Sequence, residues 1–143
     1  MAFSDDLDEQ DRRVIEIAGE DADLGSERWL VHLRATLSLP CEVTGSEDFR
    51  WEEPYVLGVY DQAEYRRLRK TRPSYRDVFI LESIEAEADG EWAMFQEDLG
   101  ANVRRKADGR RFLLGLSELR AVDESTPNRQ LLEDYSSWIV NYR

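Results

Sequence analysis

Carboxylates at alternate positions are the feature of this sequence best suited to chemistry. They are Glu85, Glu87, Asp89 and Glu91. Alternate side chains of an extended chain point the same way, and Gly90 lets the chain reverse so that the flanking acids converge. Ca²⁺ suits such a cluster because it takes about six to eight oxygen ligands in a flexible geometry. We therefore expect these four residues to bind one calcium ion, with Asp98 reaching across from the next turn.

The spacing of this loop is close to that of an EF-hand, in which acids alternate and a glycine is sixth. The sequence departs from that motif because Glu85 replaces the first aspartate and Gln96 stands at the twelfth position. The segment before the loop also has the pattern of a strand instead of a helix. The sequence therefore predicts a calcium loop that is not an EF-hand. The alternative is an acidic hairpin turn that only adds to solubility.

Four other acidic groups could each supply one or two ligands after folding. They are Glu20/Asp21/Asp23, Glu47/Asp48, Glu52/Glu53 and Asp123/Glu124. Taken singly, each group is typical of a solvated surface. If the alternating acids do not bind calcium, Glu47/Asp48 and Asp123/Glu124 are the next groups to test.

Residues typical of other active sites are isolated in this sequence. His32 is the only histidine and has no cysteine or carboxylate at ligand spacing, so a zinc site is not expected. Cys41 follows Pro40 and is expected to be a buried structural cysteine. The sequence contains no phosphate-binding loop, dinucleotide fingerprint, nucleophile elbow or zinc-protease motif. We therefore expect a protein that is not an enzyme.

Composition and charge limit the class of partner. A chain of 143 residues fits a single domain spanning 1–143. With 19 basic and 31 acidic residues, its formal charge of −12 disfavours nucleic acid and favours cations or a basic protein surface. The second functional hypothesis is therefore an acidic interaction module that docks a basic protein partner.

The expected location follows from three further observations on the sequence. A single cysteine, Cys41, forms no internal disulfide and is compatible with a reducing compartment. Residues 1–10 are acidic and lack the apolar core of a secretory signal. No run of about 18 apolar residues is present, so no transmembrane helix is expected. These observations predict a cytoplasmic protein that does not associate with membranes.

One segment reverses the charge of the chain. Residues 64–76 hold six basic residues and one acid, Glu64, which leaves 13 basic and 30 acidic residues, a net charge of −17, elsewhere. Tyr60, Tyr65 and Tyr75 are interleaved, a pattern also found in nucleic-acid patches. Because the remaining charge repels phosphate, we expect the segment Arg66–Arg76 to contact the acidic body or a second copy of the chain instead.

The order of elements predicts the fold class. Helices are expected at about 4–18, with an acidic start near Ser4, and at about 26–38, where Ser26 can cap the helix. Short strands are expected between about 40 and 122, at Pro40–Thr44, Tyr55–Tyr60, Asp77–Glu85, Trp92–Gln96, Ala101–Lys106 and Arg110–Val122. No helix separates successive strands, so parallel winding is not expected. The prediction is an α+β fold with an antiparallel, strongly bent sheet or small, partly open barrel of about five strands, two N-terminal helices and one C-terminal helix.

A final helix is predicted over about 127–142. Thr126 is the expected N-cap, with Pro127 at the first helical position, where its missing N–H costs nothing. The apolar face comprises Leu131, Leu132, Tyr135, Trp138, Ile139 and Tyr142. The opposite face comprises Arg129, Glu133, Asp134 and Asn141. This helix should therefore lie on the sheet.

The two ends of the chain resemble a known family. "RFLLGLSELRAVD" followed by "NRQLLEDYSSWIVNYR" is similar to the C-terminal end of a small bacterial calcium-binding protein family first known from cyanobacteria. "ERWLVHL" followed by Leu39-Pro40-Cys41 resembles the same family, although Leu39 and Cys41 replace its aromatic residues. The resemblance implies a calcium buffer or sensor that is not an EF-hand protein.

Overall fold

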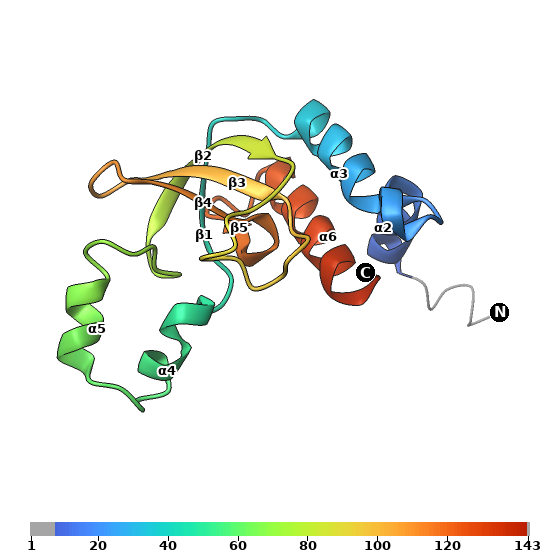
Figure 1. Ribbon diagram of the computed structural model, residues 1–143. Coiled ribbons are helices and arrows are strands. Elements are labelled where there is room, and N and C mark those ends of the chain that lie inside the picture. Colours follow the sequence, from blue (N-terminus) through green and yellow to red (C-terminus); the bar gives the residue numbers. More distant parts are fainter. Residues whose placement is uncertain (1–7, 143) are drawn as a thin grey trace.

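The computed structural model describes residues 8–142, apart from the side chains of Ala22 and Asp23. In chain order (Figure 1) the elements are α2 (Glu9–Ala18), α3 (Ala22–Thr36), β1 (Cys41–Gly45), the 3₁₀ turn η1 (Arg50–Glu52), α4 (Glu53–Val56), α5 (Gln62–Leu68), β2 (Val78–Glu85), β3 (Gly100–Arg105), β4 (Arg111–Gly115), the 3₁₀ turn η2 (Leu116–Glu118), β5 (Leu119–Ala121) and α6 (Pro127–Asn141). The predicted helix start near Ser4 lies outside the described residues. No helix in the described part is both long and apolar enough to cross a membrane.

The strands form one antiparallel sheet in the order β4-β3-β2-β1-β5. The sheet does not close into a barrel, so the predicted α+β class and five antiparallel strands are confirmed in the open form. The predicted strand Ala101–Lys106 and the start of the predicted strand Arg110–Val122 pair as the β3–β4 hairpin, and Gly109 in the turn between them takes a φ of +77°, which glycine adopts at no steric cost. After β4, the chain turns through η2 and crosses to the far edge, where β5 pairs with β1.

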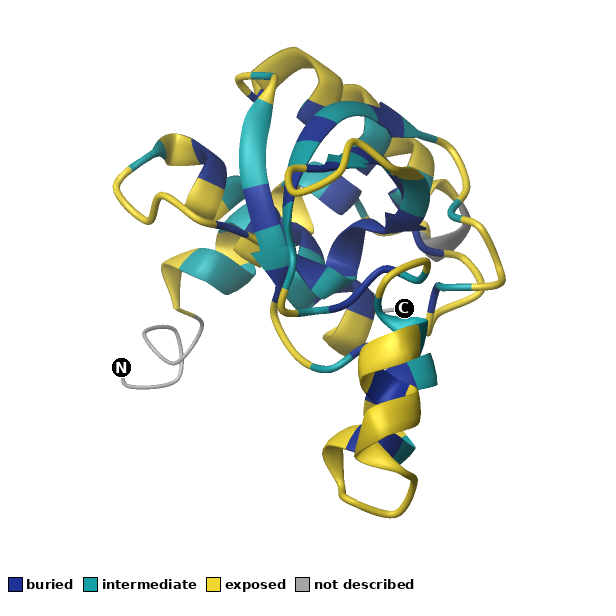
Figure 2. Cartoon of the chain, turned by 90° about the vertical axis from the view of Figure 1, so that its left-hand side faces the viewer, coloured by how far each residue is buried: buried dark blue, intermediate teal, exposed yellow. Residues whose placement is uncertain are grey.

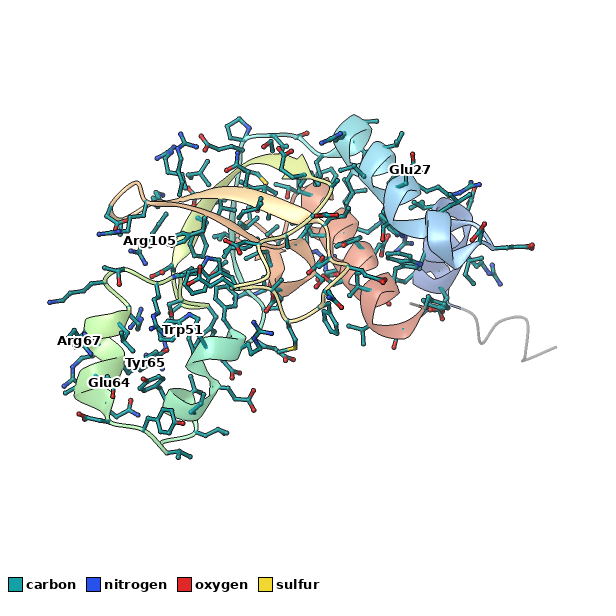
Figure 3. The ribbon with its side chains drawn as sticks, in the orientation of Figure 1. Glu27, Trp51, Glu64, Tyr65, Arg67 and Arg105 are labelled. Carbon is teal, nitrogen blue, oxygen red and sulfur yellow. The ribbon has the colours of Figure 1, made fainter. Side chains whose placement is uncertain are left out.

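The predicted strand Tyr55–Tyr60 is wrong. Pro54 instead lies in the first turn of α4, where its missing N–H is tolerated, and Asp61 caps α5 by accepting from the Ala63 N–H at 3.0 Å. The two short helices, with η1, form an arm of residues 50–72 that projects from the sheet (Figures 1 and 2). Trp51 and Tyr65 lie in the space between the arm helices (Figure 3).

The predicted strand Trp92–Gln96 and its hairpin with β2 are also wrong. Asp89 closes a tight local turn in which its carbonyl accepts from Trp92 and Ala93 at 3.1 and 3.0 Å. Residues 86–99 are a long connection without a strand, and β2 pairs with β3. The Asp89-Gly90 pair therefore marks a turn within the connection rather than a reversal between two strands.

The second helix begins earlier than predicted. Ser26 does not cap it, because α3 already starts at Ala22. Gly25 is helical and lies directly against the Trp138 ring, where a Cβ would collide. Close packing between α3 and α6 thus explains a glycine inside a helix, where it otherwise costs about 1 kcal/mol.

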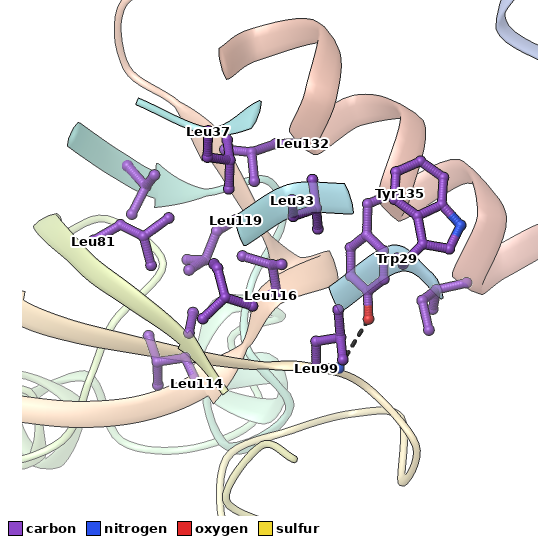
Figure 4. Close-up of a cluster of buried hydrophobic side chains, with 14 of the residues drawn as sticks. Trp29, Leu33, Leu37, Leu81, Leu99, Leu114, Leu116, Leu119, Leu132 and Tyr135 are labelled. Atoms are coloured by element: carbon purple, nitrogen blue, oxygen red, sulfur yellow. Dashed lines mark hydrogen bonds between the residues drawn. The ribbon is translucent and has the colours of Figure 1, made fainter. Parts of the chain in front are cut away.

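The core lies between the sheet and the helices α2, α3 and α6. Trp29, Leu33, Leu132 and Tyr135 are fully buried there, and Tyr135 reaches the Leu99 N–H at 2.8 Å (Figure 4). Burying such a side chain contributes about 1.5–3 kcal/mol. The predicted apolar face of α6 is confirmed for Leu132, Tyr135, Trp138 and Ile139.

Asp134 corrects the predicted polar face of α6. Its carboxylate is 2% exposed and accepts from Arg13 Nε at 2.8 Å and Nη2 at 3.2 Å, as well as from Gln10. The residue therefore faces α2 and joins the two ends of the chain. The sequence pattern failed here because a buried acid paired with arginine looks like a surface acid until its partner is known.

Candidate functional site

The five predicted ligands do not form one cluster in the structure. Glu85 ends β2, where its Oε1 accepts from Ser83 Oγ at 2.9 Å and its Oε2 lies 3.8 Å from Arg34 Nη2. Asp89 accepts from the Glu91 N–H at 2.9 Å, and Glu91 is exposed. Glu87 is exposed, and its carbonyl lies against Gly100. The part of the chain that the structure describes contains no preformed group of three or more acid, histidine or cysteine side chains able to hold a metal ion.

Asp98 lies apart from the other four, inside the molecule. It is 1% exposed and accepts from Ser117 Oγ at 2.6 Å, Tyr135 Oη at 2.7 Å and the Ser117 N–H at 3.2 Å. Burial raises the pKa of Asp98, and the hydrogen bonds from Ser117 and Tyr135 oppose that shift. Every donor to this carboxylate is neutral, so its negative charge has no ion-pair partner in the described chain.

The carboxylate of Glu118 lies close to that of Asp98. A Cβ placed on Gly115 would lie 2.6 Å from Asp98 Oδ2 and 2.6 Å from Glu118 Oε2, so the glycine makes room for both carboxylates. Among the described residues, Glu118 accepts a hydrogen bond from the Met94 N–H alone, at 3.2 Å. Burial raises the pKa of Glu118 to about 7; the Asp98 charge adds to the shift, whereas the Met94 N–H and Arg50 oppose it.

A cavity of about 250 Å³ opens beside this pair of carboxylates. It is lined by Ser46, Glu47, Asp48, Met94, Phe95, Ser117, Glu118, Ser136 and Val140. The loop after β1, the connection 86–99, η2 and α6 therefore meet at one place. Glu47 and Asp48, the pair that the sequence offers as the next candidate, stand at this cavity, Glu47 exposed and Asp48 half-buried.

The chemistry of this cavity suits a hard cation. Its charged groups are the carboxylates of Glu47, Asp48 and Glu118, and hydroxyl oxygens come from Ser46, Ser117 and Ser136. All of these are oxygen donors, which Ca²⁺ and Mg²⁺ prefer, and no histidine or cysteine lines the cavity. A cation here would also relieve the repulsion between Asp98 and Glu118. The types of donor present are therefore those of an oxygen-ligated divalent cation, although the described structure does not gather three acids here into a preformed metal-binding group.

Sequence reasoning missed Glu118. Its signal is an acid inside an apolar run, Leu116-Ser117-Glu118-Leu119, at the step that carries the family resemblance. That signal was not used because a single acid at the end of a strand is usually exposed. The 3₁₀ turn η2 changes its direction and turns Glu118 toward the cavity and Asp98.

Comparisons with known proteins give one structural match. No family model and no curated protein sequence matches the chain. The crystal structure of CcbP from Anabaena is similar, with a TM-score of 0.56 and 16% sequence identity over 91% of this chain and 88% of that chain. At this identity the match shows that the two chains share a fold.

Proposed function

We propose that this chain is a non-catalytic, cytoplasmic calcium-binding protein, a buffer or sensor, whose ion is held at the cavity beside Glu118. The observation that carries the proposal is the pair of carboxylates of Asp98, which is buried, and Glu118, which is half-buried, with no cationic side chain of the described residues bonded to either. Buried charges in proteins are paired or bind metal ions. A bound divalent cation would supply the missing positive charge.

The ligand assignments follow from the positions around the cavity. Glu118 would bind the ion from η2, and Glu47 and Asp48 would bind it from the loop after β1. Asp98 lies behind Glu118, holds Ser117 in place and adds negative charge. Ca²⁺ fits better than Mg²⁺, since two of these carboxylates sit on an irregular loop and Ca²⁺ tolerates irregular geometry.

The fold and the sequence resemblance support the same ion. The structural neighbour CcbP is a cyanobacterial calcium-binding protein. The matched C-terminal motifs include Glu118 on η2 and Asp134-Tyr135 on α6. Tyr135 in turn donates to Asp98 at 2.7 Å, so the resembling stretch contains or contacts both buried carboxylates.

The alternating acids of the connection 86–99 form a second proposed site. Glu85, Glu87, Asp89 and Glu91 lie on the segment that precedes Met94 and Phe95, which line the cavity. Arg50 Nη2 donates to the Gly90 carbonyl at 3.1 Å, which fixes this loop beside the loop carrying Asp48. Calcium bound here would neutralise three exposed acids and the half-buried Glu85 without using Asp98 or Glu118.

Calorimetry in low salt tests the function and separates the two sites. We expect a saturable Ca²⁺ heat that survives excess Mg²⁺, lost in the double variant Glu118→Gln, Asp48→Asn and kept in the matched variant Glu87→Gln, Asp89→Asn. The reverse pattern would place the ion on the alternating acids. No saturable heat in the unsubstituted chain would contradict calcium binding and leave the acidic interaction module as the function.

Thermal unfolding gives an independent measurement of the same binding. At a free Ca²⁺ concentration of about 100 times Kd, the folded state should gain about 2.7 kcal/mol. The melting temperature should therefore rise with Ca²⁺ and return on adding chelator. An unchanged melting temperature at millimolar Ca²⁺ would contradict any site formed by the folded chain.

A further inference from the structure

The arm of residues 50–72 ends in an apolar tip that is exposed to solvent. Its exposed side chains are Val56, Leu57, Val59 and Tyr60. Leu57 is 69% exposed and Val59 is 71% exposed, and the tip lies at the end of the arm farthest from the sheet (Figures 1 and 2). A contiguous apolar group of this kind on a projecting element is typical of a contact surface.

The tip has a defined conformation. The Leu57 N–H donates to the Glu53 carbonyl at 3.0 Å and the Val59 N–H to the Pro54 carbonyl at 2.9 Å. Below the tip, the Tyr55 and Tyr65 rings stack at 5.3 Å and 12°, and Gln62 donates to the Tyr55 carbonyl at 2.7 Å. A surface that is ordered before it binds loses less entropy on docking.

A buried carboxylate anchors the arm to the body of the protein. Glu52 is 0% exposed and accepts from Tyr65 Oη at 2.7 Å, Ser74 Oγ at 2.6 Å and the Tyr75 N–H at 2.8 Å. These donors come from α5 and from the chain that leads into β2. Both sides of the arm are therefore fastened to one group.

Arg105 forms a second anchor at the end of β3 (Figure 3). Its guanidinium, 4% exposed, donates to the carbonyls of Arg69, Lys70 and Arg72 at 2.8–3.1 Å. It also pairs with Asp77 at 3.1 Å and Asp108 at 2.8 Å. The two anchors hold a rigid arm that contributes little to the core, which indicates that its position matters to something outside this chain.

The side chains on the outer side of the arm are basic. Arg66, Arg67 and Lys70 are exposed, and none of them forms an ion pair within the described chain. Arg69 and Arg72 instead turn inward, to Asp77 and to the Trp51 ring. Part of the charge of the segment is thus used next to the segment itself, at Asp77 and the Trp51 ring, and the charges of Arg66, Arg67 and Lys70 have no ion-pair partner among the described residues.

A complementary surface lies at the other end of the molecule. A groove of about 640 Å³ on α2 and α3 is lined by Ile17, Leu24, Glu27, Arg28, Val31, His32 and Ala35. Val31 is 65% exposed and Leu24 is 41% exposed, so the groove is apolar and open. Glu27 and Arg28 are the charged residues of the groove lining, and the stretch 8–28, which forms α2 and the first half of α3, contains eight acids and three arginines, a net charge of −5, against +5 for residues 64–76.

We propose that the arm tip of one copy docks in the α2–α3 groove of a second copy. Leu57 and Val59 would enter beside Leu24 and Val31, while Arg66 and Arg67 would face the acids around Glu27. Both apolar surfaces are exposed among the described residues and the two charges are opposite, so this chain carries each half of the contact.

The two surfaces lie at opposite ends of the folded molecule, with Arg67 on the arm and Glu27 on α3 (Figure 3). One copy cannot satisfy its own groove with its own rigid arm. The contact is therefore head to tail, and it can continue from copy to copy without closing. Because a few side chains form the contact, it belongs to the class of small, weak interfaces, below about 1,200 Å².

Sedimentation at concentrations up to about 1 mM tests this proposal. We expect the average mass of the unsubstituted chain to rise steadily with concentration. Leu57→Asp removes the tip and Val31→Asp removes the groove, and each should lower the association constant at least about tenfold. Val122→Asp, at a valine 39% exposed and outside both surfaces, is the matched control and should associate like the unsubstituted chain. All three substitutions are at exposed positions, so each protein should fold.

Mixing the two association-deficient variants, Leu57→Asp and Val31→Asp, provides the decisive measurement. Leu57→Asp keeps its groove and Val31→Asp keeps its arm, so an equal mixture should form dimers, and no larger species, although neither variant associates alone. A mixture that stays monomeric would overturn the head-to-tail contact. An unsubstituted chain that remains monomeric over the whole concentration range would overturn it as well.

Discussion

The carboxylates of Asp98 and Glu118 both lie against Gly115, where a Cβ would be 2.6 Å from an oxygen of each. Asp98 arrives from the end of the connection before β3, whereas Glu118 belongs to the turn after β4. Asp98 is kept wholly from water and Glu118 partly, and the charge of Asp98 raises the cost of charging Glu118. The folded chain therefore maintains an unfavourable pair of charges at one cavity, and binding of a cation is the simplest event that relieves it.

Replacing Glu118 by glutamine separates its role in binding from its role in folding. Glu118→Gln removes a ligand charge, so Ca²⁺ affinity should fall by at least about tenfold, the equivalent of one strong charge interaction. The calcium-free protein should become more stable at pH 8, because a buried like-charge repulsion disappears. Titration calorimetry and denaturant unfolding measure the two effects.

Glu16→Gln is the control for this substitution. Glu16 is exposed on α2 and does not line the cavity. The same change of charge there should leave both affinity and stability within experimental error. Equal losses of affinity in the two variants would show that Glu118 acts only through the net charge of the chain.

Calcium affinity should depend on pH in the range set by Glu118. Since burial raises the pKa of Glu118 to about 7, a proton competes with the ion below that pH. Affinity should be nearly constant above about pH 8 and should fall by up to about tenfold per pH unit below 7. Isotherms at pH 6, 7 and 8 measure the slope. A flat profile, with the same profile in Glu118→Gln, would exclude Glu118 as a ligand.

The same carboxylate should make the stability of the calcium-free protein decrease as the pH rises. The folded pKa of Glu118 lies above its unfolded value of 4.5, so the folded state binds the extra proton. Its contribution to stability is then greatest below about 4.5 and is lost as pH rises through about 7. Subtracting the unfolding curve of Glu118→Gln from that of the unsubstituted chain isolates this contribution. A difference that grows in the opposite direction would contradict the buried environment of Glu118.

The sequence predicts most strongly those elements whose signals agree at several levels. The β3–β4 hairpin has both the Asp-Gly turn pair and apolar runs on each side, and α6 has a Pro127 start and a wide apolar face. The arm and the connection 86–99 were mispredicted because short apolar and aromatic runs fit a strand and a helical turn equally well. Tyr55 illustrates this, since its burial comes from stacking on Tyr65 and not from a sheet.

The site was harder to predict than the fold. Asp98 was selected from the sequence, but as a surface ligand of a turn, whereas it is buried under Tyr135. Glu118 gains its role only because Gly115 lets two distant segments meet, and one sequence does not reveal such a meeting. Periodicity reports which side of an element faces the core, but it does not report which acids lie beside one another.

Tyr135→Phe tests whether the hydroxyl of Tyr135 supports the site. That hydroxyl accepts from the Leu99 N–H at 2.8 Å and donates to Asp98 at 2.7 Å. Its loss leaves a buried N–H and a buried carboxylate each short of one partner, which should cost about 1–3 kcal/mol of unfolding free energy. Denaturant unfolding measures the loss, which should be smaller with Ca²⁺ bound. A fully tolerated substitution would mean that Asp98 is protonated and has no need of this donor.

Gly115→Ala tests the meeting of the two carboxylates directly. Gly115 has a φ of −71°, which any residue adopts, so an alanine there introduces no backbone strain. Its methyl group would lie 2.6 Å from one oxygen of Asp98 and one of Glu118, and must push them apart. Ca²⁺ affinity should therefore fall, and the pH dependence of calcium-free stability between about 4.5 and 7 should weaken as Glu118 moves toward water.

Gly90→Ala is the matched substitution. A Cβ there meets no atom within 4 Å, and the residue does not have a positive φ. The change should leave the folded structure intact and stabilise it by about 0.4–1 kcal/mol through a smaller unfolded-state entropy. If the cavity beside Glu118 holds the ion, Gly115→Ala weakens binding and Gly90→Ala does not. If the alternating acids around Gly90 hold the ion, the result is reversed: Gly90→Ala weakens Ca²⁺ binding and Gly115→Ala does not. The reason is that the loop at Gly90 must then adjust its conformation around the ion.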